Sequence, residues 1–211
     1  MQRPSSGRRL ASLSMLLLSA VPGFAQDSAS PKSNVPAVGD RNVFVFGGAF
    51  HSSWFWNSFV PVAVPYENDY FLGVGVQQML YRTDWSITLG AELGVGARLA
   101  GDGGQSSAEV WAAGVVRHDG FDLFDKFHVT PSWSLGLSFV TDPIGVEAER
   151  AKAAPKPVNM LIYMGPEIAV NPIDEPGTEY FFRVQHRSGG LGLIMSFDGS
   201  NAATVGVRFK F

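Results

Sequence analysis

Cysteine is absent from the 211-residue sequence, and charged residues are scarce. Without cysteine the chain has no disulfide, no thiolate nucleophile and no cysteine ligand for a metal. Its four histidines are scattered without the spacing of metal ligands, so we expect neither a metal nor another cofactor. Charged residues make up only 17% of the chain, whereas soluble domains carry about 25%. The net charge of −3 excludes a basic nucleic-acid-binding protein.

Long apolar runs are missing as well, except for one near the start of the chain. Three arginines within the first nine residues precede an apolar run from Leu10 to Val21 and the small residues around Ala25. This order is typical of a secretory signal peptide, and the run is shorter than the roughly 20 residues that a membrane helix needs. We therefore predict a signal peptide over residues 1–25, a flexible lead-in over 26–40 and the folded domain over 41–211.

From residue 41 onward, apolar residues alternate with small or polar ones instead of following a helical period. The clearest stretch runs from Trp85 to Leu99, where every second residue is apolar. Such a strand is longer than the five or six residues that are about usual for a strand, and its small, polar second face does not suit a packed core. A strand with lipid on one face and a polar interior on the other explains both features.

The same alternation recurs in eight segments with turn signals between them. These are residues 42–50, 70–81, 84–100, 108–118, 128–140, 158–170, 178–188 and 202–211. Eight is an even number, as a closed antiparallel barrel in the bacterial outer membrane requires, and short connections alternate with long ones as periplasmic turns alternate with external loops. We therefore predict an all-β fold, an eight-stranded antiparallel transmembrane β-barrel.

The inner face and the last strand support this interpretation. Charged residues fall on the inner face, where we expect them to form ion pairs: Glu92, Glu109, Arg98, Arg117, Glu167 and Arg183. The chain ends on an alternating strand closed by the aromatic Phe211, which resembles the terminal signal of outer-membrane barrels. The alternative is a secreted soluble β-sandwich or lipocalin-like barrel, which would have to hide Leu93, Val207 and Phe211 in its core.

The seventh segment departs from the pattern of the others. If the apolar residues from Tyr180 to Val184 face lipid, His186 and Ser188 fall on the same face by the two-residue period of a strand. A histidine beside a serine is the minimal pair of a serine esterase, because the imidazole can take the hydroxyl proton. Parity along the last strand places Asn201 beside this pair, as the group that orients the imidazole.

Two stretches resemble a known family: His186-Arg187-Ser188-Gly189-Gly190 and Asp198-Gly199-Ser200-Asn201. They are similar to the His-x-Ser-Asn motif and the following acidic position of PagL-type lipid A 3-O-deacylases, the acyloxyacyl hydrolase-like outer-membrane barrels. The resemblance covers the last two strands by motif and the rest of the chain by strand pattern and size. In this sequence Gly189 replaces the asparagine of the motif, and Asn201 replaces the acid.

The resemblance implies an outer-membrane esterase that removes an ester-linked acyl chain from lipid A. It implies that His186 is the general base and Ser188 the nucleophile, with Asn201 or, as the alternative, Asp198 as the third member. The backbone amides of Gly189 and Gly190 would form the oxyanion hole. The expected partners are lipid A or lipopolysaccharide of the outer leaflet and the outer membrane itself, with a homodimer as an open alternative.

His51-Ser52-Ser53 also spells His-x-Ser, but we place it in the first long connection, without a partner on the last strand. The aromatic residues that follow it, Trp54 to Trp56, are interpreted as part of an interfacial belt. The alternative function is a catalytically degenerate outer-membrane barrel with a structural or adhesive role carried by its loops.

Overall fold

The computed structural model describes residues 33–101 and 103–211. The predicted signal peptide and most of the predicted lead-in lie outside these residues. Residues 33–40 are hydrogen-bonded to the end of the folded domain: the Pro36 carbonyl accepts from Arg82 Nη1 at 3.0 Å, and Asn34 Nδ2 donates to the Ile173 carbonyl at 3.3 Å. The end of the lead-in is therefore hydrogen-bonded to residues at the strand connections near Arg82 and Ile173.

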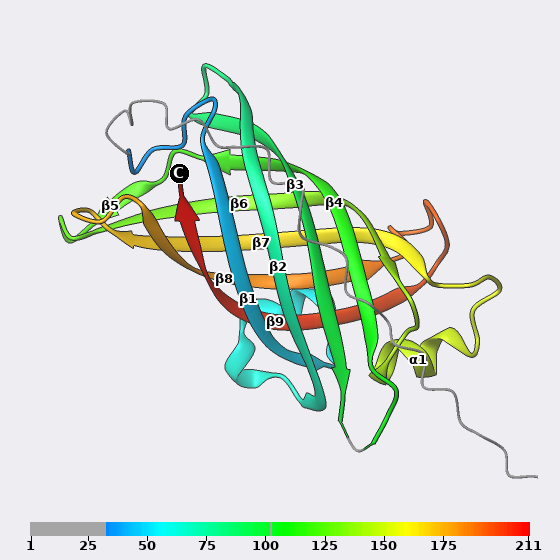
Figure 1. Ribbon diagram of the computed structural model, residues 1–211. Coiled ribbons are helices and arrows are strands. Elements are labelled where there is room, and N and C mark those ends of the chain that lie inside the picture. Colours follow the sequence, from blue (N-terminus) through cyan, green and yellow to red (C-terminus); the bar gives the residue numbers. More distant parts are fainter. Residues whose placement is uncertain (1–32, 102) are drawn as a thin grey trace, which may run out of the picture. The chain divides into compact units, whose positions relative to one another are not determined.

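Eight long strands form a closed antiparallel barrel (Figure 1). They are β1 (Arg41–His51), β2 (Tyr66–Arg82), β3 (Ile87–Ala100), β4 (Ser107–His118), β6 (Phe127–Val140), β7 (Met160–Pro172), β8 (Thr178–Ser188) and β9 (Asp198–Lys210). Pairing of β1 with β9 and of β4 with β6 closes the sheet. A three-residue strand, β5 (Phe121–Leu123), adds a short hairpin to β6. The predicted eight-stranded antiparallel barrel is confirmed.

The strand boundaries differ from the prediction mainly where turns begin. The third strand starts at Ile87 rather than at Asp84, because residues 84–86 form a turn in which Ser86 has a positive φ of 58°. Conversely, β2 and β9 begin several residues earlier than predicted. The added residues are paired in the sheet: Tyr66 with His51, and Asn201 with both His51 and His186.

Short helices occur in two long connections at the end of the barrel opposite the chain's C-terminus. The 3₁₀ helices η1 (Phe55–Phe59) and η2 (Pro61–Ala63) lie between β1 and β2, and α1 (Gly145–Ala151) lies between β6 and β7. None of the described helices is long and apolar enough to cross a membrane.

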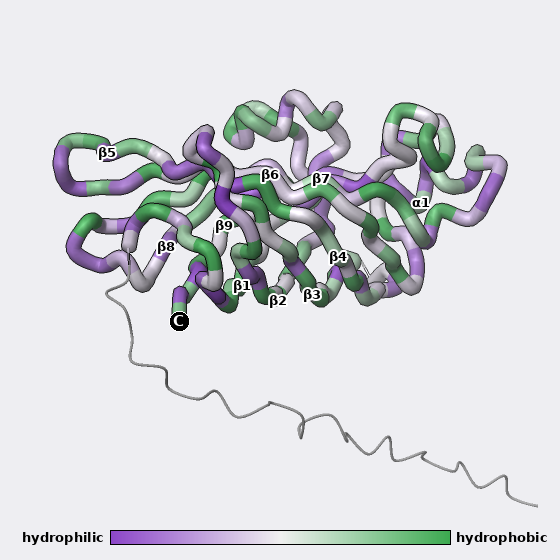
Figure 2. The backbone as a smooth tube through the Cα atoms, turned by 90° about the horizontal axis from the view of Figure 1, so that it is seen from above, coloured by the Kyte–Doolittle hydropathy of each residue, from purple (hydrophilic) through white to green (hydrophobic). Residues whose placement is uncertain are grey.

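The barrel wall is apolar on its outer face and polar within. Figure 2 shows hydrophobic and hydrophilic residues alternating along the strands. On β3, Leu93 and Val95 are 60% and 53% exposed, whereas Glu92 and Arg98 are buried in the lumen. The two faces predicted for residues 87–99 are therefore those found in the structure.

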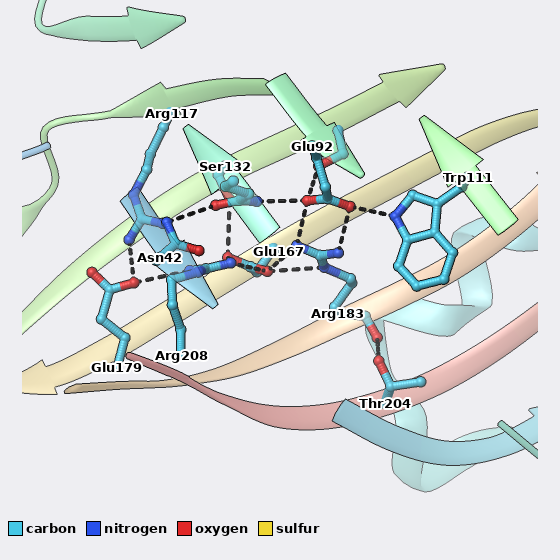
Figure 3. Close-up of polar contacts among 12 residues, drawn as sticks. Asn42, Glu92, Trp111, Arg117, Ser132, Glu167, Glu179, Arg183, Thr204 and Arg208 are labelled. Carbon is cyan, nitrogen blue, oxygen red and sulfur yellow. Dashed lines mark hydrogen bonds and ion pairs between the residues drawn. The ribbon is translucent and has the colours of Figure 1, made fainter. Parts of the chain in front are cut away.

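An ion-pair network fills the lumen (Figure 3). Its contacts are Arg183–Glu92 at 2.9 Å, Arg183–Glu167 at 2.7 Å, Arg208–Glu167 at 2.8 Å, Arg208–Glu179 at 2.9 Å and Arg117–Glu179 at 2.5 Å. Arg98 and Glu109 form a separate buried pair at 3.6 Å. Phenylalanine rings pack beside the charges, and the Arg183 guanidinium lies 4.8 Å from the Phe44 ring centroid. The predicted pairing of the inner charged residues is confirmed.

Candidate active site

A row of polar side chains crosses three neighbouring strands on the outer face of the barrel. In the sheet register His186 on β8 is opposite Asn201 on β9, which is in turn opposite His51 on β1. His186 is 2% exposed, and the other two are fully buried. Strand pairing therefore brings together His186 and Asn201, which the sequence analysis had placed on the same face.

A hydrogen bond joins His186 to Asn201. The His186 Nδ1 atom lies 2.6 Å from Asn201 Oδ1, while Asn201 Nδ2 donates to the Ser53 carbonyl at 2.9 Å. Because a carbonyl can only accept, the amide NH₂ group must face Ser53 and the amide oxygen must face the imidazole. The oxygen in turn requires a proton on Nδ1. In the neutral imidazole this leaves Nε2 unprotonated, which is the tautomer that a general base needs.

Ser188 ends the same face of β8, 8% exposed. Its pairing partner is Asp198, across a register shift between Arg187 and Ser188 that leaves Gly199 as the extra residue of a β-bulge. Only glycine fits there, since a Cβ on Gly199 would lie 2.3 Å from the Arg187 carbonyl oxygen. Within the described part of the chain no hydrogen bond joins Ser188 to His186; the Ser188 hydroxyl accepts the Gly190 N–H at 3.3 Å.

The two glycines predicted for the oxyanion hole differ in their backbone partners. The Gly189 N–H donates to the Phe197 carbonyl at 2.8 Å, so it is engaged within the β8–β9 loop. The Gly190 N–H points at the Ser188 hydroxyl, next to the place where an oxyanion would form. Gly190 has a φ of +67°, a conformation that glycine adopts without strain. The geometry therefore favours Gly190 over Gly189 as an oxyanion donor.

Asp198 is paired with Arg150 instead of being hydrogen-bonded to the imidazole. Its carboxylate forms an ion pair with Arg150 at 3.1 Å, and Arg150 also donates to the Gly199 carbonyl at 2.8 Å and to the Ser52 carbonyl at 3.2 Å. Asn201, not Asp198, is thus the hydrogen-bond partner of His186. Arg150 links the connection that contains α1 to the starts of β9 and of the first long connection.

The segment of residues 52–65 covers this row of polar side chains. In Figure 1 the segment, in cyan, folds back along the outside of the barrel beside β9. The Phe55 ring centroid lies 4.5 Å from that of His186 and 6.3 Å from that of Trp133 on β6. The aromatic residues that were expected to form an interfacial belt therefore include one that packs directly on the candidate base.

The opposite side of β8 is held by buried charges in the mouth of the barrel. Arg187, between His186 and Ser188, forms an ion pair with Glu147 of α1 and donates to the Asn159 carbonyl at 2.9 Å. Glu147 also contacts Arg98 at 2.6 Å and accepts from the Ser200 hydroxyl at 2.7 Å. Burial by itself would raise the pKa of the Glu147 carboxyl, but Arg98 and Arg187 hold that pKa below its ordinary value. This carboxylate fixes the ends of three strands behind the site.

His51 is the residue that the sequence analysis misplaced. It is the last residue of β1, not part of a loop, and it pairs with Asn201 on the last strand. The outward parity of Val45, Gly47 and Ala49 continues to His51, so the alternation could have identified it. Within residues 33–101 and 103–211, no group of three histidine or acidic side chains could hold a metal ion.

Comparisons with known proteins concern the fold. No protein-family model and no curated protein matches the chain. Among solved structures, the outer membrane enzyme PagL matches 80% of this chain and 98% of its own, with 13% identity and a TM-score of 0.50. Neisserial surface protein A matches 82% and 97%, with 12% identity and a TM-score of 0.48. The N-terminal β-barrel domain of Pseudomonas aeruginosa OprF matches 82% and 98%, with 10% identity and a TM-score of 0.44.

Similarity at this level of identity concerns the fold alone, so any chemistry has to be argued from the side chains of this chain. Strand number, closure and the apolar outer face agree with it. The protein has the closed eight-stranded fold of bacterial outer-membrane β-barrels.

Proposed function

We propose that this protein is an outer-membrane esterase that removes an ester-linked acyl chain from lipid A. The observation that carries the proposal is the hydrogen bond between His186 Nδ1 and Asn201 Oδ1, on the outer face of the barrel beside Ser188. The resemblance of these residues to the motif of PagL-type deacylases supports it. In outer-membrane barrels the short turns face the periplasm, so the site lies at the level of the outer leaflet, where lipid A resides.

The proposed reaction is acyl transfer through the serine. His186 Nε2 takes the proton of the Ser188 hydroxyl while Oγ bonds to the ester carbonyl carbon, and the Gly190 N–H stabilises the oxyanion. The ester C–O bond then breaks, and His186 returns the proton to the departing sugar oxygen. Water, deprotonated by His186, next attacks the carbonyl carbon of the acyl-enzyme; the bond to Oγ breaks, His186 returns the proton to Ser188 Oγ, and the fatty acid is released.

Two movements separate the described conformation from this reaction. The Ser188 hydroxyl must turn from the Gly190 N–H toward His186, a rotation about χ1. Residues 54–65 must also leave the wall, because Phe55 packs on the imidazole, while the Ser53 carbonyl keeps its hydrogen bond to Asn201. Neither movement requires a change in the strand register, so the barrel itself acts as a rigid support for the site.

The test is the mass of lipid A after incubation with the purified, detergent-folded protein. Loss of one acyl chain, with release of the corresponding free fatty acid, is expected. A spectrum unchanged by saturating protein over long incubation would contradict the proposal. Protein that has been unfolded by boiling is the control for hydrolysis of lipid A that does not depend on the folded barrel.

A second candidate is a barrel of this fold without activity, with a structural or adhesive role. Two observations favour it: the acid of the family motif is replaced by Asn201, and Ser188 makes no hydrogen bond to His186 within the described residues. Under this alternative lipid A stays intact, and the long connections would act by binding at the cell surface.

A further inference from the structure

His51 is a buried imidazole that the proposed reaction does not use. It is fully buried, and neither Nδ1 nor Nε2 has a hydrogen-bond partner in the described part of the chain. The His51 and Tyr66 rings pack edge to face, with centroids 6.2 Å apart and an interplanar angle of 89°. A buried polar group without a partner is destabilising, and such groups are rare in folded proteins.

The neighbouring residues of the outer wall do not require a polar side chain at position 51. The next row of the outer wall toward the barrel centre consists of Ala49, Ala203 and Val184, which are apolar although Ala203 and Val184 are also buried, at 9% and 0% exposed. A leucine at position 51 would continue that pattern and would avoid the cost of desolvation. The row of His51, Asn201 and His186 is therefore a polar strip on an apolar wall.

Segment 52–65, which covers the strip, has a different chemical character on its two sides. Its inner side supplies polar and aromatic contacts, such as the Ser53 carbonyl to Asn201 and the Phe55 ring to His186. Its outer side exposes Trp54 and Trp56, each 71% exposed, and Val62, 94% exposed. Indole rings of this kind reside at membrane interfaces. The exposed side of the cover is thus apolar like the lipid-facing wall, so a lipid could approach it from the membrane.

We propose that His51 is a substrate-binding residue, which hydrogen-bonds a second polar group of the acylated sugar once residues 54–65 have moved aside. The inference rests on the proposed function, because it takes the ester to lie at Ser188. Opposed side chains on neighbouring strands are about 5 Å apart, so His51 lies roughly 10 Å from His186 along the row. That distance suits a hydroxyl or ester of an extended sugar headgroup, and it is beyond the reach of a simple short-chain ester.

The experiment compares His51→Leu with the unmodified chain on two substrates. With lipid A, kcat/KM should fall about five- to tenfold, the loss expected for one hydrogen bond. With methyl butyrate, which has no second polar group to reach His51, the rate should stay unchanged. His51→Gln, which keeps a donor and an acceptor, should recover part of the activity on lipid A. Equal effects on both substrates, or none on lipid A, would overturn the assignment.

Binding provides a readout that does not depend on hydrolysis. In a Ser188→Ala background, native mass spectrometry of the detergent-folded protein with lipid A should show affinity about five- to tenfold weaker with His51→Leu. His118→Leu, an exposed histidine at the other end of the barrel, is the matched control and should leave binding unchanged.

The outcomes separate the two proposals. If the unmodified chain never cleaves lipid A but binds it in a manner that depends on His51, the proposed function fails and the binding site stands. If the chain cleaves lipid A and His51→Leu changes neither binding nor kcat/KM, the binding role fails and the proposed function stands. His51→Leu should fold, since it removes no hydrogen bond, and the shift in gel mobility on heating verifies this.

Discussion

At the scale of single residues, the side chains of the candidate site are distinguished by what holds them. Asn201 is fixed from two sides, by His186 and by the Ser53 carbonyl, so its amide orientation sets the imidazole tautomer. Ser188 is less constrained, because its one hydrogen bond is a 3.3 Å contact with the Gly190 N–H. A rigid base beside a mobile nucleophile is compatible with a site that becomes aligned when substrate binds.

The first prediction concerns the proposed nucleophile and base. Ser188→Ala and His186→Ala should each abolish deacylation of lipid A, and the double variant should be no worse than either, because members of one catalytic unit do not contribute additively. Both side chains face outward, so the barrel should keep its heat-dependent shift in gel mobility. Full activity of folded Ser188→Ala would place the reaction elsewhere.

The second prediction concerns the residue that replaces the family's acid. Asn201→Asp keeps the shape of the side chain and adds a negative charge beside the imidazolium that forms during the reaction; it also replaces the hydrogen bond to the Ser53 carbonyl by an oxygen–oxygen contact, which loosens the cover. A hydrogen bond to a charged group is stronger by about 1 kcal/mol than one to a neutral group, so kcat should rise roughly fivefold. Asn201→Leu, which has a similar volume and no acceptor, should lower kcat by at least tenfold. A fall in kcat with Asn201→Asp, measured on lipid A, would contradict the role given to Asn201.

At the scale of elements, the short helix α1 connects three strands of the barrel through one side chain. Its seven residues send Glu147 into the barrel mouth, where the carboxylate joins Arg98 on β3, Arg187 on β8 and Ser200 on β9. Two of these three strands, β8 and β9, carry the candidate site on their other faces. A connection that looks like a simple loop in the sequence therefore stabilises the geometry of the wall.

The third prediction is that docking of α1 depends on pH through Glu147. The pKa of its carboxyl is lower in the folded protein than in the unfolded chain, so the folded state binds fewer protons. The stabilisation is therefore complete above about pH 4.5 and is lost as the pH falls below that value, through the lower pKa of the folded state. Hydrogen exchange of residues 145–151, corrected for the intrinsic effect of pH, should show loss of protection below pH 4.5.

The control for this prediction is Glu147→Gln. It leaves Arg187 without its carboxylate partner at any pH, and breaking a buried pair costs about 3–5 kcal/mol. Protection of α1 should therefore be weak in this variant and should no longer change between pH 7 and pH 3. A pH dependence that survives the substitution would assign the effect to another group.

At the scale of the whole barrel, the lumen network fixes the cross-section. Glu92 on β3 and Arg183 on β8 meet across the interior, and Trp111 Nε1 donates to the same carboxylate at 2.7 Å. Buried charges of this kind are costly to leave unpaired, so the strands are held in one arrangement. The position of β8, and with it the candidate site, is thus determined from inside the barrel.

The fourth prediction tests this network. Glu92→Gln should lower the free energy of unfolding by about 3 kcal/mol or more, because Arg183 loses a fully buried partner. Urea unfolding in detergent micelles, followed by tryptophan fluorescence, measures the change. Glu149→Gln, which breaks an exposed pair with Lys152, is the matched control and should have little effect. Equal effects of the two changes would mean that the lumen charges do not support the fold.

The sequence by itself determined the barrel. Residues on a strand alternate between two faces, so the pattern from residue 87 to residue 99 assigns lipid and lumen without knowledge of any partner. The same parity placed His186 and Ser188 on the outer face, and it placed Asn201 with them. These are local consequences of strand geometry, and each could be derived one strand at a time.

The tertiary structure alone decided what meets across the strands. The place of His51 beside Asn201 follows from closure between the first and last strands, which are distant in the sequence. The cover of Phe55 over His186 and the reach of Glu147 to Arg187 involve irregular connections, whose paths no periodicity encodes. Alternation specifies which way a side chain faces, but register and loop path specify its neighbours, because they depend on contacts between distant parts of the chain.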